Sequence, residues 1–221
     1  RPGGYFAQKV RDPFFHWPTW LPVGSRHALL WFLFIVPVIV LGIAEATGKA
    51  AGKVEIERKV VEASPASPAA NLALCGVLFN SDQLDEALTA CRKTLELSFE
   101  WTKAHELMGR VLAKKGNFKE ATEHFQKLLR IDPNHATAHY NLGNALYHQG
   151  RVTEAKVQFE SALRIRPDYA EADNSLGVMF AQLGLNARAK ACFEHALRIA
   201  PKYAEAHNNL GVLLLNEGNL L

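Results

Sequence analysis

The sequence predicts an all-α protein, in which a solenoid of antiparallel helix hairpins follows a single transmembrane helix and an extended N-terminal arm. Two observations support this prediction. Glycine recurs at one fixed interval, at Gly109, Gly143, Gly177 and Gly211, and prolines and alanines recur with the same period. Residues 28–44 contain no charge. A fixed period of this kind is typical of stacked helical repeats, and a long uncharged run is typical of a membrane span.

Residues 1–26 are expected to form an extended arm at the membrane surface. Pro13, Pro18 and Pro22 rule out a continuous helix. Aromatic rings beside a membrane span usually lie at the membrane–water interface, and an arm without a core of its own needs a neighbour to hold it. We expect that neighbour to be an integral membrane subunit. The predicted interface residues are Phe14, Phe15, Trp17, Trp20 and, within the span, Trp31.

Residues 27–46 are predicted to form the transmembrane helix. Its uncharged run would be about 25 Å long, near the short end of what a bilayer core requires, and Pro37 is tolerable in lipid. A buried core helix is one alternative. A cleaved signal peptide is another, because the segment Ala44-Glu45-Ala46 resembles a cleavage site. We favour an anchor in the lipid bilayer, since the adjoining residues offer no domain that could bury this run.

The orientation of the span is less well specified. Four Lys or Arg residues precede it and four follow it closely, so the positive-inside rule favours neither side. Because the arm is short and the C-terminal part is long, we expect a single-pass protein with its repeats on the outer, periplasmic side. Residues 47–67 would link span and repeats through a short helix, up to Ala63, and a stiff Ser-Pro-Ala-Ser-Pro hinge.

Residues 136–169 show the repeat unit most clearly. Leu142, Gly143 and Leu146 share one face of a first helix, Ala155 and Phe159 share one face of a second, and a glycine turn joins the two. This pattern resembles the tetratricopeptide repeat (TPR). Similar units are predicted at 102–135 and 170–203, a partial unit at 204–221, and a degenerate capping unit at 68–101, which together make the array of residues 68–221.

Cysteine usage leaves two readings of the capping unit open. Cys75 and Cys91 stand where the other units have glycine and phenylalanine, and Asp82 stands at a turn glycine. The two cysteines are therefore either packing residues or a disulfide pair. Cys192 is the third cysteine, and the sequence contains no C-x-x-C motif of redox or haem-binding proteins.

The TPR resemblance implies a concave groove lined by the first helix of each hairpin. Places 2, 5, 9, 12 and 13 of the repeat would face this groove. In this chain we expect it to contain Glu106, Arg110, Tyr140, Asn144, Tyr147, His148, Asn174, Val178, Gln182, Asn208 and Val212. Among these residues only Arg110 is basic, so the Lys/Arg clamp by which some TPR cochaperones hold a carboxylate is not reproduced.

The groove also contains several asparagines, which Asn141 and Asn209 extend. This run resembles the ladder in the repeat domain of O-linked N-acetylglucosamine transferases, where side-chain amides hold a peptide backbone. An amide both donates and accepts hydrogen bonds, which suits an extended peptide or a soluble protein as partner. The alternative is that asparagine is simply a common residue in such helices.

No feature of the sequence points to catalysis, a cofactor or a metal site. The formal net charge of +3 is too small for a nucleic-acid-binding surface. His105, His139 and His207 share one phase of the repeat, but successive hairpins lie about 10 Å apart, too far for a shared metal ion. His135 and His139 are four residues apart and lack a third ligand.

The sequence therefore indicates a non-catalytic, membrane-anchored TPR scaffold or assembly factor. Its arm and span would contact integral membrane subunits, and its groove would bind a soluble protein or an extended peptide. The alternative is the TPR portion of a larger enzyme or biogenesis factor, whose catalytic part would lie beyond residue 221.

Overall fold

The computed structural model describes residues 51–216 and Gly218. The chain divides into two units, residues 1–51 and 52–221, and the repeats belong to the second. The predicted arm, transmembrane helix and first linker residues lie outside the described part, as do the interface aromatics. Among the helices of residues 51–216, none has the length and apolar character needed to cross a membrane.

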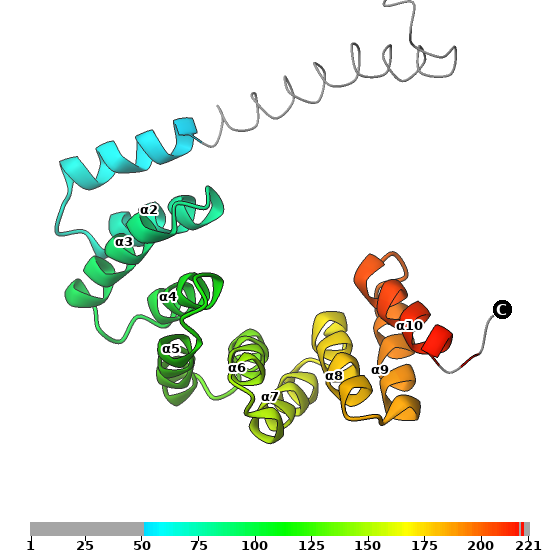
Figure 1. The fold of residues 1–221 in the computed structure, drawn as a ribbon. Helices are drawn as coiled ribbons and strands as arrows, with labels where there is room; N and C mark the ends of the chain where they lie inside the picture. The colour runs from blue at the N-terminus through cyan, green and yellow to red at the C-terminus, as the bar shows by residue number, and fades with distance from the viewer. Residues whose placement is uncertain (1–50, 217, 219–221) are drawn as a thin grey trace, which may run out of the picture. The chain divides into compact units, whose positions relative to one another are not determined.

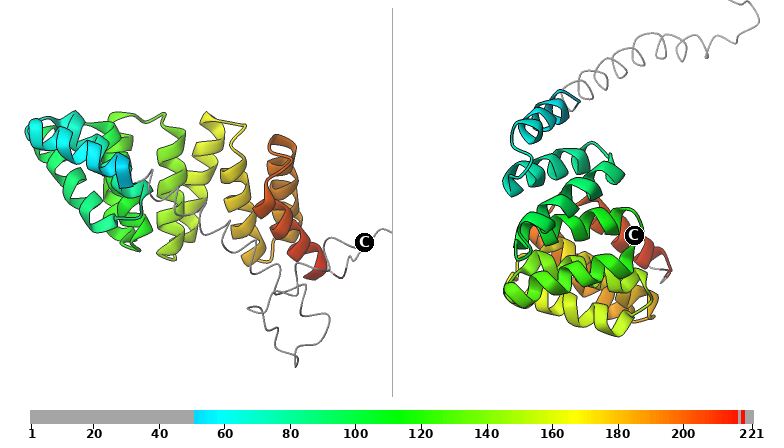
Figure 2. Two further views of the ribbon diagram at one scale, coloured as in Figure 1. Left: turned by 90° about the horizontal axis from the view of Figure 1, so that it is seen from above. Right: turned by 90° about the vertical axis from the view of Figure 1, so that its left-hand side faces the viewer.

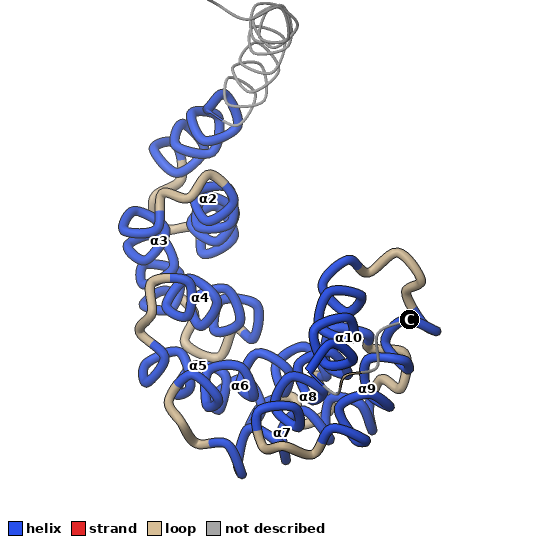
Figure 3. The backbone as a smooth tube through the Cα atoms, turned by 45° about the vertical axis from the view of Figure 1, so that its right-hand side comes forward, coloured by secondary structure: helices blue, strands red, loops and turns tan. Residues whose placement is uncertain are grey.

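The second unit consists of helices joined by short loops, without strands among its described residues (Figure 3). After a helical segment at residues 51–63, the helices are α2 (Pro68–Asn80), α3 (Leu84–Leu97), α4 (Thr102–Lys114), α5 (Phe118–Ile131), α6 (Ala136–His148), α7 (Val152–Ile165), α8 (Ala170–Gln182), α9 (Asn186–Ile199) and α10 (Ala204–Asn216). Successive first helices begin at the same constant interval as the periodic glycines, and so do successive second helices. The sequence period is therefore also the structural period.

The turn inside each hairpin explains the periodic glycine. Gly150 follows α6 with a φ of +73°, and the equivalent glycines of the other units have similar positive values. A residue in this left-handed conformation ends a helix and favours glycine, which has no Cβ to clash. In the capping unit Asp82 has a φ of 61° at the same place. Asp is one of the few other residues that tolerate this conformation, so the degenerate unit keeps the turn.

The hairpins pack in chain order. Each first helix contacts its own second helix, each second helix contacts the next first helix, and α4 also touches α2 and α6. In Figure 1 the first helices α4, α6 and α8 lie on the inner side of the row, and α5, α7 and α9 lie on the outer side. The two further views in Figure 2 show the same row of neighbouring hairpins. This arrangement confirms the predicted solenoid of antiparallel helix hairpins.

A glycine and a phenylalanine interlock in each of the three hairpins from α4 to α9. A Cβ atom built at Gly143 would lie 2.7 Å from Cε1 of Phe159, and Gly109 and Gly177 meet Phe125 and Phe193 in the same way. The three rings are at most 1% exposed. Glycine is therefore required at this crossing because the ring of the second helix occupies the space of a side chain.

The capping hairpin replaces this contact with a covalent bond. Cys75 of α2 and Cys91 of α3 form a disulfide with Cα atoms 5.3 Å apart, and both residues are fully buried. Of the two readings left open by the sequence, the disulfide is the one found in the structure. Cys192 is a free, partly buried thiol.

The described residues of the predicted linker pack onto the capping hairpin. In the helical segment at residues 51–63, Val54 is only 4% exposed and joins the same core as Cys75 and Leu78. Arg58 donates a hydrogen bond to Glu86 of α3. These residues therefore cover the N-terminal end of the array, where a stack of repeats would otherwise expose apolar surface.

The histidines at place 4 of the repeat close the loops that precede their helices. Nε2 of His105, His139 and His207 lies 2.9–3.0 Å from the carbonyl oxygen six residues earlier, so this nitrogen donates the hydrogen bond. His105 also meets His124, with Nδ1 atoms 3.0 Å apart. Burial is the main cause that lowers the pKa of both histidines, that of His124 to about 4, so this pair is neutral near pH 7.

Candidate partner-binding groove

The predicted groove residues lie on the first helices of the hairpins, and they differ in what they contact. At the N-terminal end, the guanidinium carbon of Arg110 lies 4.8 Å from the ring centre of Phe79 on α2, and Nζ of Lys114 lies 5.3 Å from it. Lys114 also forms an ion pair with Asp82 at 2.7 Å. This end of the inner side therefore presents two cations above one aromatic ring.

In the middle, aromatic side chains link neighbouring units. Tyr140 packs against Tyr169, with ring centres 5.0 Å apart. The hydroxyl of Tyr147 donates a hydrogen bond to Gln182, so α6 and α8 are connected across the groove surface. Burial raises the pKa of Tyr147, which keeps its phenol protonated as a donor at neutral pH.

Three other predicted residues lie near this middle region. Asn144 is half-buried on α6. His148 stacks on Phe118 of the preceding unit, with ring centres 4.5 Å apart, so its ring contributes to the contact between repeats. Glu106 lies 4.0 Å from Nε2 of His135. His148 and Glu106 thus both contact residues outside their own helices.

At the C-terminal end, groove residues of two helices surround a small cavity. Val178 and Gln182 of α8 and Val212 of α10 line it together with Asn209, above the buried ring of Phe193. Its volume is about 190 Å³. Small-molecule sites usually measure about 300–1,000 Å³, so this cavity is better matched to a single side chain.

Asn174 is placed differently from its neighbours in the predicted groove. Its side chain is buried, with only 1% exposed. Its Nδ2 donates to Glu205 at 3.0 Å, and its Oδ1 accepts from Nδ2 of Asn209 at 2.9 Å. Both polar ends therefore join α8 to α10 and are not available to a peptide. Asn208, at the same repeat place one unit later, is exposed.

Comparison with known protein families identifies the repeats of the array. The family models described as TPR repeat and tetratricopeptide repeat match residues 109–150, 136–169, 170–203 and 192–221. Residues 109–221 are tetratricopeptide repeats. A comparison with the curated proteins found no match.

Solved structures of TPR proteins resemble the array. MamA is 22% identical with a TM-score of 0.64, and the match covers 73% of this chain and 94% of MamA. YrrB, described as a TPR protein with an unusual peptide-binding site, is 25% identical with a TM-score of 0.60, covering 75% and 86%. Pseudomonas aeruginosa PilF is 26% identical with a TM-score of 0.63, covering 68% and 69%. Proteins built from such repeats are generally scaffolds for protein–protein interaction.

Two groove residues of the TPR array were missed from the sequence. Phe79 occupies place 12 of the capping unit, as Tyr147 does in its own unit, and Lys114 occupies place 13 of the next unit. Applying the repeat register to residues 68–101 would have found Phe79, and Lys114 stands at a groove place that the sequence analysis named but left unfilled in that unit. The degenerate appearance of the capping unit concealed the first of these.

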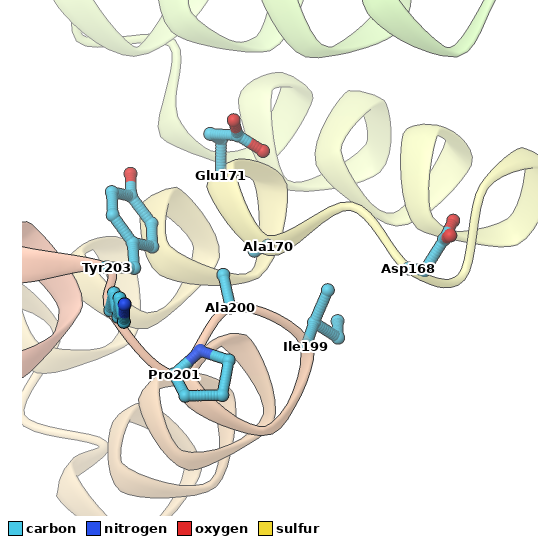
Figure 4. A pocket seen from close by; sticks show the side chains of 8 residues that line it. Asp168, Ala170, Glu171, Ile199, Ala200, Pro201 and Tyr203 are labelled. Carbon is cyan, nitrogen blue, oxygen red and sulfur yellow. The ribbon is translucent and has the colours of Figure 1, made fainter.

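A wider hollow lies beside the start of α8, and none of the predicted groove residues lines it (Figure 4). It is formed by Ala170 and Glu171 at the start of α8 and by the loop from Ile199 to Tyr203. A similar hollow occurs near the N-terminal end of the array, between Pro68, Ala69 and Trp101. Because it recurs at equivalent repeat boundaries, we attribute it to the loop geometry of the repeats.

The described residues do not offer an activated nucleophile. Nδ1 of His195 lies 2.6 Å from the buried carboxylate of Asp173, near Cys192. Burial, followed by the charge of Asp173, raises the pKa of Cys192 to about 11, so the thiol stays protonated. Within residues 51–216, no three His, Cys, Asp or Glu side chains are grouped closely enough to hold a metal ion.

Proposed function

We propose that this protein is a non-catalytic scaffold that binds an extended segment of a partner protein along the inner side of its TPR array. The cavity between α8 and α10 is the main observation behind this proposal, because it brings together predicted groove residues from two repeats. An apolar side chain of the partner would enter it between Val178 and Val212. The peptide-binding site of YrrB, as its description states, is consistent with this use of the fold.

The charge of the inner side suggests the direction of the partner segment. Arg110 and Lys114 stand at the N-terminal end, and the exposed Glu205 stands at the C-terminal end. A segment with an acidic residue near Arg110 and a basic residue near Glu205 would match both charges. Polar side chains such as Asn144 in the middle and Gln182 beside the cavity would pair with the backbone of the segment, and this pairing does not depend on the segment's sequence.

A substitution in the cavity tests this function. Val212→Glu is expected to weaken binding of peptides selected against the wild-type protein by about tenfold or more, because it places a charge where an apolar side chain is buried. Isothermal titration calorimetry would measure this. Val157→Glu on α7 is the matched control, since Val157 is 52% exposed and Val212 is 49% exposed. Equal effects of the two substitutions, or no effect of Val212→Glu, would contradict the proposal.

We also propose that residues 27–46 anchor the scaffold in a membrane, with the arm at residues 1–26 against integral subunits and the array on the outer side. The uncharged run and the flanking aromatics support the anchor. The disulfide favours an oxidising compartment for the array. Deleting residues 1–46 is expected to move the protein from the membrane pellet to the soluble fraction. Retention in the pellet after a high-salt wash would exclude this segment as the main anchor.

A further inference from the structure

The two cysteines of the capping hairpin occupy the positions of an interlocking pair. In the three following hairpins, a glycine of the first helix and a phenylalanine of the second fill one space between the helices. Cys75 and Cys91 have the same separation in sequence as each of these pairs, are fully buried, and are joined by a bond. The disulfide thus stands where the core of every other complete hairpin has an aromatic ring.

The hairpin depends on this bond more than a well-filled hairpin would. Two bonded cysteine side chains have less volume than a phenylalanine ring, and the bond holds the Cα atoms of the two helices 5.3 Å apart. Two separate thiols would have to lie further apart, which would spread the helices or leave a void. The hairpin is also the first of the row, so it has a complete hairpin on one side only. Terminal repeats with few neighbours open most easily.

We propose that the Cys75–Cys91 disulfide is a redox latch that orders the capping hairpin. In reduction, a dithiol transfers two protons and two electrons to the Cys75–Cys91 disulfide and becomes a disulfide itself, which leaves Cys75 and Cys91 as thiols. The hairpin of α2 and α3 then loosens, while the units from α6 onward keep their interlocked glycines and rings. Because both cysteines are buried, the exchange proceeds through local opening of this hairpin.

The latch also controls one end of the inner side. Phe79 lies on α2, four residues after Cys75, and supports the cations of Arg110 and Lys114. When α2 loosens, this aromatic support is lost, whereas the cavity between α8 and α10 is unchanged. This consequence for partner binding rests on the proposed function, but the redox dependence of the hairpin does not.

Hydrogen exchange measured by mass spectrometry tests the latch on the full chain, with and without dithiothreitol. Closing a loop of this length restricts the unfolded chain enough that protection in α2 and α3 is expected to fall roughly 100-fold on reduction. Protection in α7 and α8 is expected to stay the same. Alkylation of free thiols before digestion would verify the redox state of each sample.

The chain supplies its own matched control. Cys75→Gly with Cys91→Phe installs the glycine–phenylalanine pair of the next three hairpins. In this variant the hydrogen-exchange protection of α2 and α3 is expected to be independent of dithiothreitol. Cys75→Ala with Cys91→Ala is expected to resemble the reduced wild-type protein. The proposal is overturned if fully reduced wild-type protein keeps its protection in α2 and α3, or if protein purified in air carries two free thiols there. Neither result involves a partner, so failure of the latch is distinct from failure of the binding function.

Discussion

Gly177→Leu is expected to lower the free energy of unfolding of the array by about 1–3 kcal/mol, the usual cost of overpacking a core. A Cβ atom at Gly177 would lie 2.6 Å from Cε1 and 2.8 Å from Cδ1 of Phe193. That ring is only 1% exposed, so it must shift within the core to accept a side chain at Gly177. The clash outweighs the better helix propensity of leucine, which alone would stabilise α8 by up to about 1 kcal/mol.

Gly211→Leu is the matched control for this prediction. Gly211 occupies the same place of the next repeat, but no atom lies within 4 Å of a Cβ built there. Its substitution is therefore expected to leave stability unchanged or slightly raised. Urea unfolding followed by circular dichroism would compare the two variants. If both lower the urea midpoint equally, the glycine–phenylalanine contact is not the reason for glycine at this place.

Asn174→Ala is expected to destabilise the contact between α8 and α10 by about 2 kcal/mol, from the usual contributions of the hydrogen bonds that it removes. One of these bonds goes to the carboxylate of Glu205 and the other to the amide of Asn209. Bonds to charged groups contribute about 1.5–3 kcal/mol, and neutral bonds about 0.5–1.5 kcal/mol. Glu205 is exposed and regains water, which keeps the total near the lower end.

Hydrogen exchange in α10 would measure this loss, with Asn208→Ala as the control. Asn208 has the same repeat place as Asn174 but is exposed, so its removal is expected to change little. Unchanged exchange in α10 of Asn174→Ala would show that the buried amide does not hold these helices together. Asn174 would then again be a candidate residue for binding a partner.

The backbone of the array was predictable in detail because its signals are local. The turn glycine before α7, the small residue at Gly143 and the ring of Phe159 all lie within one repeat unit. The same repeat positions make the same contacts in each unit. The fold of one unit with a clear sequence pattern therefore predicts the fold of the others. Even the capping unit kept its turn, since Asp82 tolerates the conformation that glycine adopts elsewhere.

The surface was less predictable because its contacts cross between units. The partners of Asn174 lie 31 and 35 residues away in sequence, and both are specific to this pair of repeats. The repeat pattern tells which places face the groove. It does not tell which side chain of the next repeat will contact a residue at one of those places. For that reason Asn174 was assigned to the groove. Phe79, which supports Arg110, was overlooked because the register was not applied to the degenerate capping unit.

By itself, the sequence determined the repeat period, the helices and turns, and the need for glycine where an aromatic ring crosses, because each follows from contacts inside one hairpin. Only the tertiary structure decided whether a polar side chain faces a partner or a neighbouring repeat. It also decided that the two buried cysteines bond to one another. Both outcomes depend on which atoms meet once hairpins pack together, and distances of a few ångströms across a helix crossing are not encoded in the period.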